Sequence, residues 1–86
     1  MPDDLTAEFQ RAATDVKQLP TRPDNDTLLK LYALYKQGAV GDVCGDKPGF
    51  FDFVGTAKYE AWSKLRGMHA DEAQQKYIEL VRQLGA

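Results

Sequence analysis

The sequence predicts an all-α protein, a small four-helix bundle, and three observations lead to this fold class. Apolar residues recur at spacings of three and four in four separate stretches, as on the buried face of an amphipathic helix. Alternation of apolar and polar residues never persists long enough to indicate a strand. The 86 residues suffice for one small domain, so we expect a single domain over residues 1–86 whose helices share one core.

The first predicted helix begins near Asp3 or Asp4, either of which can cap its N-terminus. Its apolar face consists of Leu5, Phe9, Ala12, Ala13 and Val16. The helix is expected to end near Leu19, because Pro20 biases the residue before it away from helical backbone.

A stiff connector at residues 20–23 leads to the second predicted helix, which has Asp24 as its N-cap. Its apolar residues, again at helical spacing, are Leu28, Leu31, Tyr32 and Tyr35. We expect this helix to run through Gln37, because Gly38 and Gly41 bracket its end.

A long loop is expected from Gly38 to about Asp52. The apolar residues in and beside it are Val40, Val43, Phe50, Phe51 and Phe53. Since such a loop would expose much apolar surface if it stood free, we expect it to pack across the helices. Long loops inside compact domains are usually functional.

The third predicted helix runs from about Thr56 to Arg66 and is ended by Gly67. Its inner stripe is Ala57, Ala61 and Leu65, and a second stripe is formed by Lys58 and Trp62. The fourth helix follows at once, with Asp71 and Glu72 in its first turn, where acidic residues favour the helix dipole. Its buried face comprises Ala73, Tyr77, Leu80, Val81 and Leu84.

The composition excludes several classes of protein. A net charge of −2 argues against a dedicated nucleic-acid binder, whose affinity depends on a strong positive field. Cys44 is the single cysteine, so no internal disulfide can form, which points to a reducing, cytoplasmic setting. The acidic start does not resemble a signal peptide, and no apolar run is long enough to span a membrane, so we expect no stable membrane insertion.

No pattern of catalytic or metal-binding residues emerges. His69 is the only histidine, and nothing in the sequence indicates that it meets Cys44 as the base for a nucleophile. One cysteine, one histidine and scattered carboxylates show no metal-ligand spacing. Ser63, the only serine, lies inside a predicted helix and not at its start, which excludes an acyl carrier protein with a phosphopantetheine arm. We therefore predict a protein with no catalytic residue, no metal and no cofactor.

A face of the second helix indicates a ligand instead. Tyr32, Tyr35 and Lys36 lie three and four residues apart and so share one face. Rings can stack on a base, hydroxyls can bind phosphate or ribose, and an ammonium pairs with phosphate. Lys17, Lys58 and Tyr77 extend this pattern to the other helices. Taken singly, each tyrosine could instead pack in the core with its hydroxyl at the rim, and each lysine could snorkel to solvent.

The sequence also resembles the acyl-CoA-binding protein family, through five motifs in family order. These motifs are Tyr32–Gln37, Val40–Asp42, residues 48–53 with Pro48-Gly49 and Asp52-Phe53, Ala57–Trp62 and Ala73–Ile78. The resemblance spans roughly Phe9 to Leu84 and implies an up-down-down-up four-helix bundle. It implies that the protein binds, sequesters and transports medium- and long-chain acyl-CoA thioesters as a monomer and is not an enzyme.

The resemblance also assigns roles to individual residues. Tyr32 matches the family tyrosine at the adenine, while Tyr35 and Lys36 match the pair at the nucleotide, with the lysine on the ribose phosphate. Lys58 matches a further lysine of the CoA site. The remaining matches are Lys17 at the pocket edge, Tyr77 closing over the site, and Phe9, Ala12 and Leu29 lining the groove for the acyl chain.

Some positions depart from the family pattern. Val54 and Thr56 stand where many members carry lysines, which lowers the positive charge available for phosphates, although Arg22 and Lys47 could replace part of it. Met68 and His69 stand where small hydroxyl residues often cap the fourth helix. The alternative function is a helical protein-interaction module that keeps the fold without ligand binding, and retention of the tyrosines and lysines argues against it.

Overall fold

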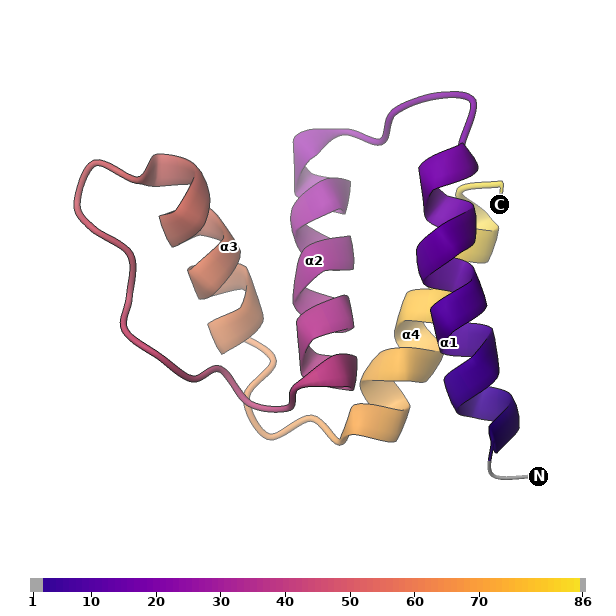
Figure 1. The fold of residues 1–86 in the computed structure, drawn as a ribbon. Coiled ribbons are helices and arrows are strands. Elements are labelled where there is room, and N and C mark those ends of the chain that lie inside the picture. Colours follow the sequence, from indigo (N-terminus) through magenta and orange to yellow (C-terminus); the bar gives the residue numbers. More distant parts are fainter. Residues whose placement is uncertain (1–2, 86) are drawn as a thin grey trace.

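The computed structural model describes residues 3–85, and every regular element in that range is helical. The elements are α1 (Asp3–Asp15), a short 3-10 helix η1 (Val16–Gln18), α2 (Asn25–Ala39), α3 (Phe53–Ser63) and α4 (Ala70–Gln83). In the view of Figure 1, α1 and α4 ascend while α2 and α3 descend. The predicted all-α, up-down-down-up four-helix bundle is therefore confirmed.

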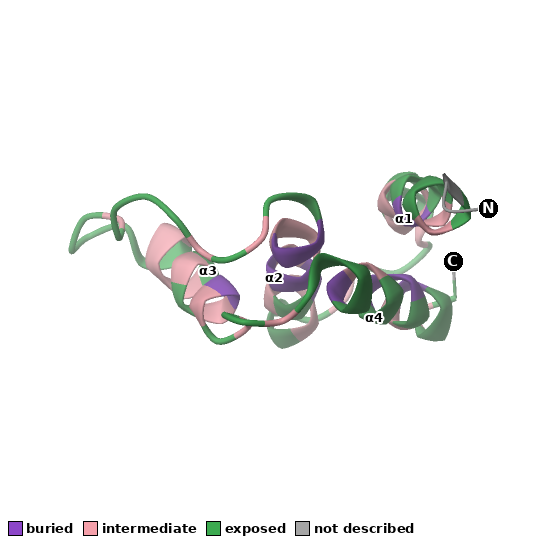
Figure 2. Cartoon of the chain, turned by 90° about the horizontal axis from the view of Figure 1, so that it is seen from below, coloured by how far each residue is buried: buried purple, intermediate pink, exposed green. Residues whose placement is uncertain are grey.

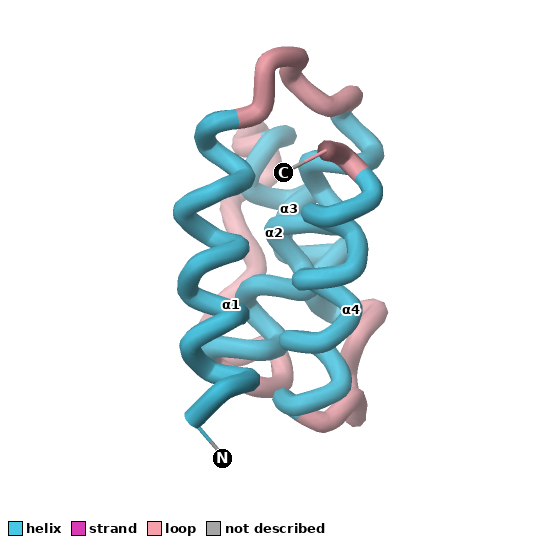
Figure 3. Tube along the Cα trace, turned by 90° about the vertical axis from the view of Figure 1, so that its right-hand side faces the viewer, coloured by secondary structure: helices cyan, strands magenta, loops and turns pink. Residues whose placement is uncertain are grey.

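The helices form a flat array and not a square bundle. The chain measures 41 × 30 × 15 Å along its principal axes. α4 packs against both α1 and α2, and α3 packs on the opposite side of α2 (Figure 2). Seen from the side, α1 and α4 stand next to each other in front of α2 and α3 (Figure 3). α3 thus depends mainly on α2 for its place in the fold.

The main core lies where α1, α2 and α4 meet. Its buried members are Phe9, Ala12, Leu31, Leu34, Ala73, Tyr77, Ile78 and Val81. The face predicted for α4 is confirmed at Ala73, Tyr77 and Val81, whereas Leu80 and Leu84 are half-buried at its edge. Because these side chains recur at helical spacing on three helices, burying them together excludes water from all three inner faces.

The first connection follows the prediction closely. α1 ends at Asp15 and continues as η1, and Leu19 has the extended backbone expected before Pro20. Asp24 caps α2, since its carboxylate accepts a hydrogen bond from the Thr27 backbone N–H at 2.8 Å. The predicted cap of α1 remains untested, because α1 begins at Asp3 and the residue before it lies outside the described residues.

α2 runs two residues past the predicted last residue, Gln37, and ends at Ala39, between the two glycines expected to bracket its end. Gly38 lies inside the helix and is buried, and a Cβ placed there would come within 2.9 Å of the Gln74 Cγ. Its carbonyl accepts a hydrogen bond from Gln74 Nε2 at 2.9 Å, so the glycine serves the close approach of α4. α2 ends two residues before Gly41, whose φ of +101° suits glycine and turns the chain.

Both ends predicted for α3 are wrong, and the helix ends at Ser63, three residues before the predicted Arg66. The helix begins at Phe53 and not near Thr56, because the Asp52 carboxylate accepts a hydrogen bond from the Gly55 N–H at 2.9 Å and caps it there. The predicted inner stripe, Ala57, Ala61 and Leu65, is only half-buried. Trp62, assigned to the second stripe, is the residue that α3 buries.

The loop between α2 and α3 does not pack across the helices as predicted. The side chains of Phe50 and Phe51 are 83% and 82% exposed. The loop follows α3 through polar contacts instead: the Tyr59 hydroxyl donates to the Gly45 carbonyl at 3.1 Å, and an exposed ion pair joins Lys47 to Glu60 at 3.1 Å. These contacts hold the backbone and leave the phenylalanines in solvent.

Candidate functional site

A large cavity lies between the N-terminal halves of α2 and α3, and we call it the groove. It has a volume of about 640 Å³, within the range of small-molecule sites. It is lined by Arg22, Asn25, Leu28, Leu29, Tyr32, Phe53, Val54, Ala57 and Lys58. Most of these side chains are apolar, and the cations Arg22 and Lys58 lie among them. The groove can therefore hold a ligand with an apolar body and an anionic group.

Tyr32 and Lys58 meet at this groove from opposite helices. The Lys58 Nζ lies 5.2 Å from the centre of the Tyr32 ring, a cation–π contact between α3 and α2. Tyr32 is half-buried and Lys58 is exposed, so the ammonium remains accessible from solvent. The ring fixes the average position of an otherwise mobile cation at the edge of the groove.

Lys36 forms a second pair of the same kind with Trp62. The Lys36 Nζ lies 5.1 Å from the centre of the indole ring. The indole is itself fixed, because Trp62 is only 6% exposed and its Nε1–H donates to the Gly41 carbonyl at 2.8 Å. A rigid ring thus supports the lysine side chain and holds its ammonium over one face.

The Tyr32–Lys58 and Lys36–Trp62 pairs follow one another along the contact between the parallel helices α2 and α3, and we call each pair a rung. Tyr32 and Lys36 are four residues apart on α2, and Lys58 and Trp62 are four apart on α3. Because α2 and α3 run in the same direction (Figure 1), one register aligns both pairs. The cation comes from α3 in one rung and from α2 in the next. The line of contact between α2 and α3, which we call the seam, therefore carries two cations.

A polar cluster ties this seam to the start of α4. Gln37 is fully buried, and its Nε2 donates to Asp42 Oδ1 at 2.9 Å and to the Met68 carbonyl at 2.8 Å. Asp42 Oδ1 also accepts from the Gly67 N–H at 2.8 Å. The bonds from Gly67 and then Gln37 stabilise the carboxylate and lower the pKa of Asp42 below its usual value. Gln37 Oε1 is buried and has no partner among the described residues.

Three predicted site residues instead form an aromatic cluster in the core, with Tyr35 at its edge. The ring of Phe9 stacks on Tyr35 at 5.2 Å and meets Tyr77 edge-on at 5.3 Å, and Tyr35 and Tyr77 lie 5.8 Å apart. Phe9 and Tyr77 are 1% and 4% exposed. Burial, together with the neighbouring Tyr35, raises the pKa of Tyr77, so its hydroxyl stays protonated at neutral pH.

The structure divides the nine predicted residues among different places. Leu29, Tyr32 and Lys58 line the groove, and Lys36 lies one rung further along. Phe9, Tyr35 and Tyr77 are together but do not line it. Ala12 is buried in the core, and Lys17 is exposed in η1, directly after α1.

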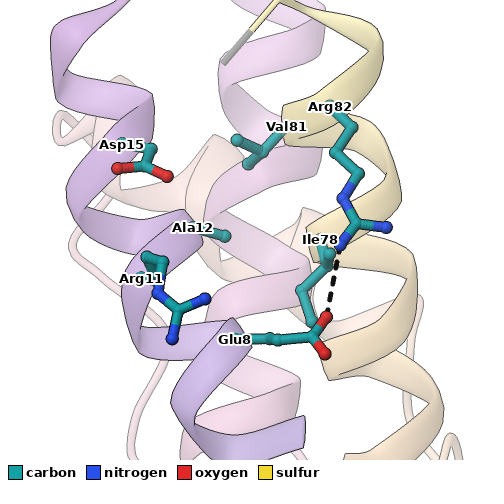
Figure 4. Close-up of a pocket in the computed structure, with 7 residues that line it drawn as sticks. All are labelled: Glu8, Arg11, Ala12, Asp15, Ile78, Val81 and Arg82. Carbon is teal, nitrogen blue, oxygen red and sulfur yellow. Dashed lines mark hydrogen bonds and ion pairs between the residues drawn. The ribbon is translucent and has the colours of Figure 1, made fainter. Parts of the chain in front are cut away.

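Ala12 also borders a second, much smaller hollow between α1 and α4. Figure 4 shows it beneath the exposed ion pair of Glu8 and Arg82, whose nitrogen and oxygen are 3.3 Å apart. Its volume is about 80 Å³, room for a few water molecules only. A ligand large enough to contact both α2 and α3 through their lysines does not fit there. Volume and lining therefore both favour the groove as the binding site.

Several groove residues did not stand out in the sequence. Asn25, Phe53 and Ala57 line the groove without having been predicted as site residues, and Phe53 had been assigned to the loop. The signal that could have placed Phe53 is the Asp52 cap immediately before it. Val54 lines the groove as an apolar side chain.

The residues weighed for catalysis lie apart from this site. Cys44 is exposed in the loop, and His69 is exposed at the N-cap of α4, where its side chain makes no capping hydrogen bond. Within residues 3–85, no group of three His, Cys, Asp or Glu side chains could hold a metal ion. No helix in the same range is both long and apolar enough to cross a membrane.

Comparison with known proteins gives consistent matches. A sequence profile described as acyl CoA binding protein matches residues 6–81. Acyl-CoA-binding protein homolog 1 of Caenorhabditis elegans is 54% identical over 80 residues, 93% of each chain. Acyl-CoA-binding protein of Saccharomyces cerevisiae is 49% identical over 76 residues, 88% of this chain and 87% of that one.

Solved structures agree with the sequence matches. The crystal structure of Oryza sativa acyl-CoA-binding protein 2 superposes with a TM-score of 0.88 at 40% identity, covering 93% of this chain and 89% of that one. The solution structure of yeast acyl coenzyme A binding protein has a TM-score of 0.74 at 46% identity and covers 95% and 92%.

Proposed function

This chain belongs to the acyl-CoA-binding protein family, and from that premise we propose that it binds acyl-CoA thioesters non-covalently in the groove between α2 and α3. Members of this family are binding proteins and not enzymes, and the same holds for this chain. Sequestration and transport of the thioester follow from binding, since a held acyl chain is kept from water and from other surfaces. Nothing favours the alternative of an interaction module without a ligand.

The single observation that carries the proposal is the pair of lysine–aromatic rungs beside an apolar groove. CoA carries several phosphate charges, and Lys36 and Lys58 supply two cations on one seam of a net-acidic protein. The adjoining groove supplies Leu28, Leu29 and Phe53 for the acyl chain. A free fatty acid would contact only the apolar half of the proposed site, and free CoA would contact only its charged half.

The proposed roles of the site residues follow from these positions. Tyr32 stacks on the adenine, a contact worth about 1–3 kcal/mol by analogy with single-strand nucleic-acid binders. Lys36 binds the ribose phosphate and Lys58 a neighbouring phosphate. We further propose that Tyr35 and Tyr77 present hydroxyls to the nucleotide end. The other members of the proposed site are Lys17 as an edge cation, Leu29 in the wall of the groove, and Phe9 and Ala12 as the packing behind it.

The acyl chain supplies the binding free energy that should make an acyl-CoA bind more tightly than free CoA. Each methylene that leaves water contributes about 0.8 kcal/mol when fully buried. The affinity should therefore rise steeply from short to long acyl chains until the groove is full. Free CoA should bind far more weakly than any long-chain ester, because it lacks this contribution.

A calorimetric titration with acyl-CoAs of increasing length tests the proposal, with free CoA and free fatty acid as controls. Trp62 gives a parallel fluorescence signal, because its ring lies against Lys36. We expect saturable binding that tightens with chain length and exceeds both controls. Absence of saturable binding to every acyl-CoA would overturn the proposal, and equal affinity for free fatty acid would remove the role given to the lysines.

Three further properties belong to the same proposal. We propose that residues 1–86 act as one domain, since the helices share one core and the matched region spans most of the chain. A monomer suffices, because the groove is formed by two helices of one chain. A cytoplasmic, reducing location is supported by Cys44 as the single cysteine.

A further inference from the structure

Another cavity, distinct from the small hollow between α1 and α4, continues the groove along α3, and we call it the distal cleft. It has a volume of about 530 Å³ and is walled by Pro48 and Phe50 of the loop and by Thr56 of α3. Phe53 and Ala57 line both the distal cleft and the groove. Because these two residues are one helical turn apart on the same face, the two cavities are neighbours across a single pair of side chains.

The lining of the distal cleft suits hydrocarbon and not phosphate. Its cation, Lys47, is already paired with Glu60 at 3.1 Å, and both belong to the lining. The ammonium is therefore compensated and offers little attraction to an anion. The remaining wall is phenylalanine, proline, alanine and the partly apolar threonine.

Phe53 separates the two cavities without being locked in place. It is 71% exposed, so few neighbours oppose a change of its side-chain rotamer. An occupant that fills the groove can therefore displace the ring toward solvent and continue past Ala57, whose small side chain leaves room. Phe50, 83% exposed, would lose much of its contact with water when the distal cleft is filled.

We propose that the distal cleft receives the terminal methylenes of the longest acyl chains, and that Phe53 and Phe50 extend the range of chain lengths this protein holds. The inference rests on the proposed binding of acyl-CoA in the groove. Chains that end within the groove do not reach Phe50. Chains that pass Phe53 gain a second apolar wall.

The chain offers a matched pair of variants for the test. Phe50 and Phe51 are adjacent, of the same residue type and almost equally exposed, at 83% and 82%. Only Phe50 lines the distal cleft. Phe50→Ala therefore removes a wall of the proposed site. Phe51→Ala removes a similarly exposed ring that touches the Phe50 ring edge-on, at 5.0 Å between ring centres, but does not line the cleft. Phe50→Leu keeps an apolar wall and serves as the conservative variant.

The experiment measures Kd for octanoyl-, dodecanoyl-, hexadecanoyl- and eicosanoyl-CoA with each variant. Full burial of a methylene raises affinity about fourfold, and a cleft open to solvent on one side should give about half of that free energy, or twofold. Phe50→Ala should therefore weaken eicosanoyl-CoA by about three- to tenfold and leave octanoyl-CoA unchanged. Phe51→Ala should change neither by more than about twofold, and Phe50→Leu should restore most of the loss.

The outcomes separate this inference from the function on which it rests. If the unmodified protein binds no acyl-CoA, the proposed function itself fails. If it binds all four ligands but Phe50→Ala matches Phe51→Ala at every length, only the distal cleft proposal is overturned. A loss with Phe50→Ala that is equal for octanoyl- and eicosanoyl-CoA also overturns it, since a contact with the chain end must depend on length.

Discussion

Replacement of Lys36 by methionine isolates the contribution of one cation to ligand binding. Methionine keeps an unbranched apolar side chain that can still lie on the Trp62 ring, so the fold around the seam should be preserved. What is removed is the ammonium, which the proposal places on the ribose phosphate of CoA.

The magnitude follows from the contact that Lys36 makes without ligand. Its cation–π contact with Trp62, at 5.1 Å, is worth about 0.5–1 kcal/mol at a partly exposed site. A hydrogen bond to a charged group contributes about 1.5–3 kcal/mol. If phosphate draws the ammonium away from the ring, the net gain is the difference, about 0.5–2.5 kcal/mol. Lys36→Met should therefore raise Kd roughly two- to seventyfold.

The assay is calorimetry with one acyl-CoA and with its analogue that lacks the ribose 3′-phosphate. The loss on Lys36→Met should be large for the first ligand and small for the second. Lys30→Met is the matched control, because Lys30 is an exposed lysine of α2 that does not line the groove. Equal losses with both ligands, or a loss no larger than that of Lys30→Met, would refute the assignment of Lys36 to this phosphate.

Three further predictions concern the supports of the site. Gln37→Glu should lower the free energy of unfolding in urea by about 3–5 kcal/mol, because it places a buried charge beside Asp42 and leaves the Met68 carbonyl without its donor. Gln37→Met, which introduces no charge, should lower it by about 1–3 kcal/mol. Equal losses with the two variants would contradict this account. Since hydrogen bonds hold the pKa of Asp42 below 3.8, its stabilising effect is complete above that pH and disappears as the pH falls through the lowered value. Asp42→Asn should accordingly flatten the acid limb of thermal stability against pH, and an unchanged limb would exclude Asp42 as its source. Tyr77→Phe should leave unfolding within about 0.5 kcal/mol of the original protein but weaken acyl-CoA about tenfold; unaltered affinity would assign Tyr77 to the core alone.

Helical periodicity was sufficient to predict the order of the helices, whereas their up-down-down-up direction was implied by the family resemblance. Periodicity did not give the end of α2 or either end of α3 correctly. Gly38 lies inside α2 because Gln74 of α4 needs the space, and a contact between distant residues leaves no local signal. The start of α3 did have one, the Asp52 cap. It was overlooked because the phenylalanines around it were assigned to a loop expected to be buried. Their exposure depends on how the loop is held along α3, which composition does not reveal.

The candidate site was predicted only in part, and the reason is related. An aromatic residue on an inner face can line a pocket or fill a core, and the pattern is the same for both. Tyr32 lines the groove, whereas Phe9 and Tyr77 pack against one another in the core. The rung of Lys36 and Trp62 was not predicted, although equal four-residue spacings on two parallel helices could have indicated it.

The two ends of the α2–α3 pair are built differently, and the difference matches the two halves of the proposed ligand. At their C-terminal ends the helices are held together by buried Trp62 and by hydrogen bonds to Gly41 and Asp42. At their N-terminal ends α3 leans away from α2 (Figure 1), and exposed Phe53 and half-buried Leu29 border the space. Hydrogen bonds to phosphate depend on direction and need the fixed end, whereas the burial of methylenes is non-directional and tolerates the open one. The same pair of helices can therefore be specific for the nucleotide and permissive toward the length of the acyl chain.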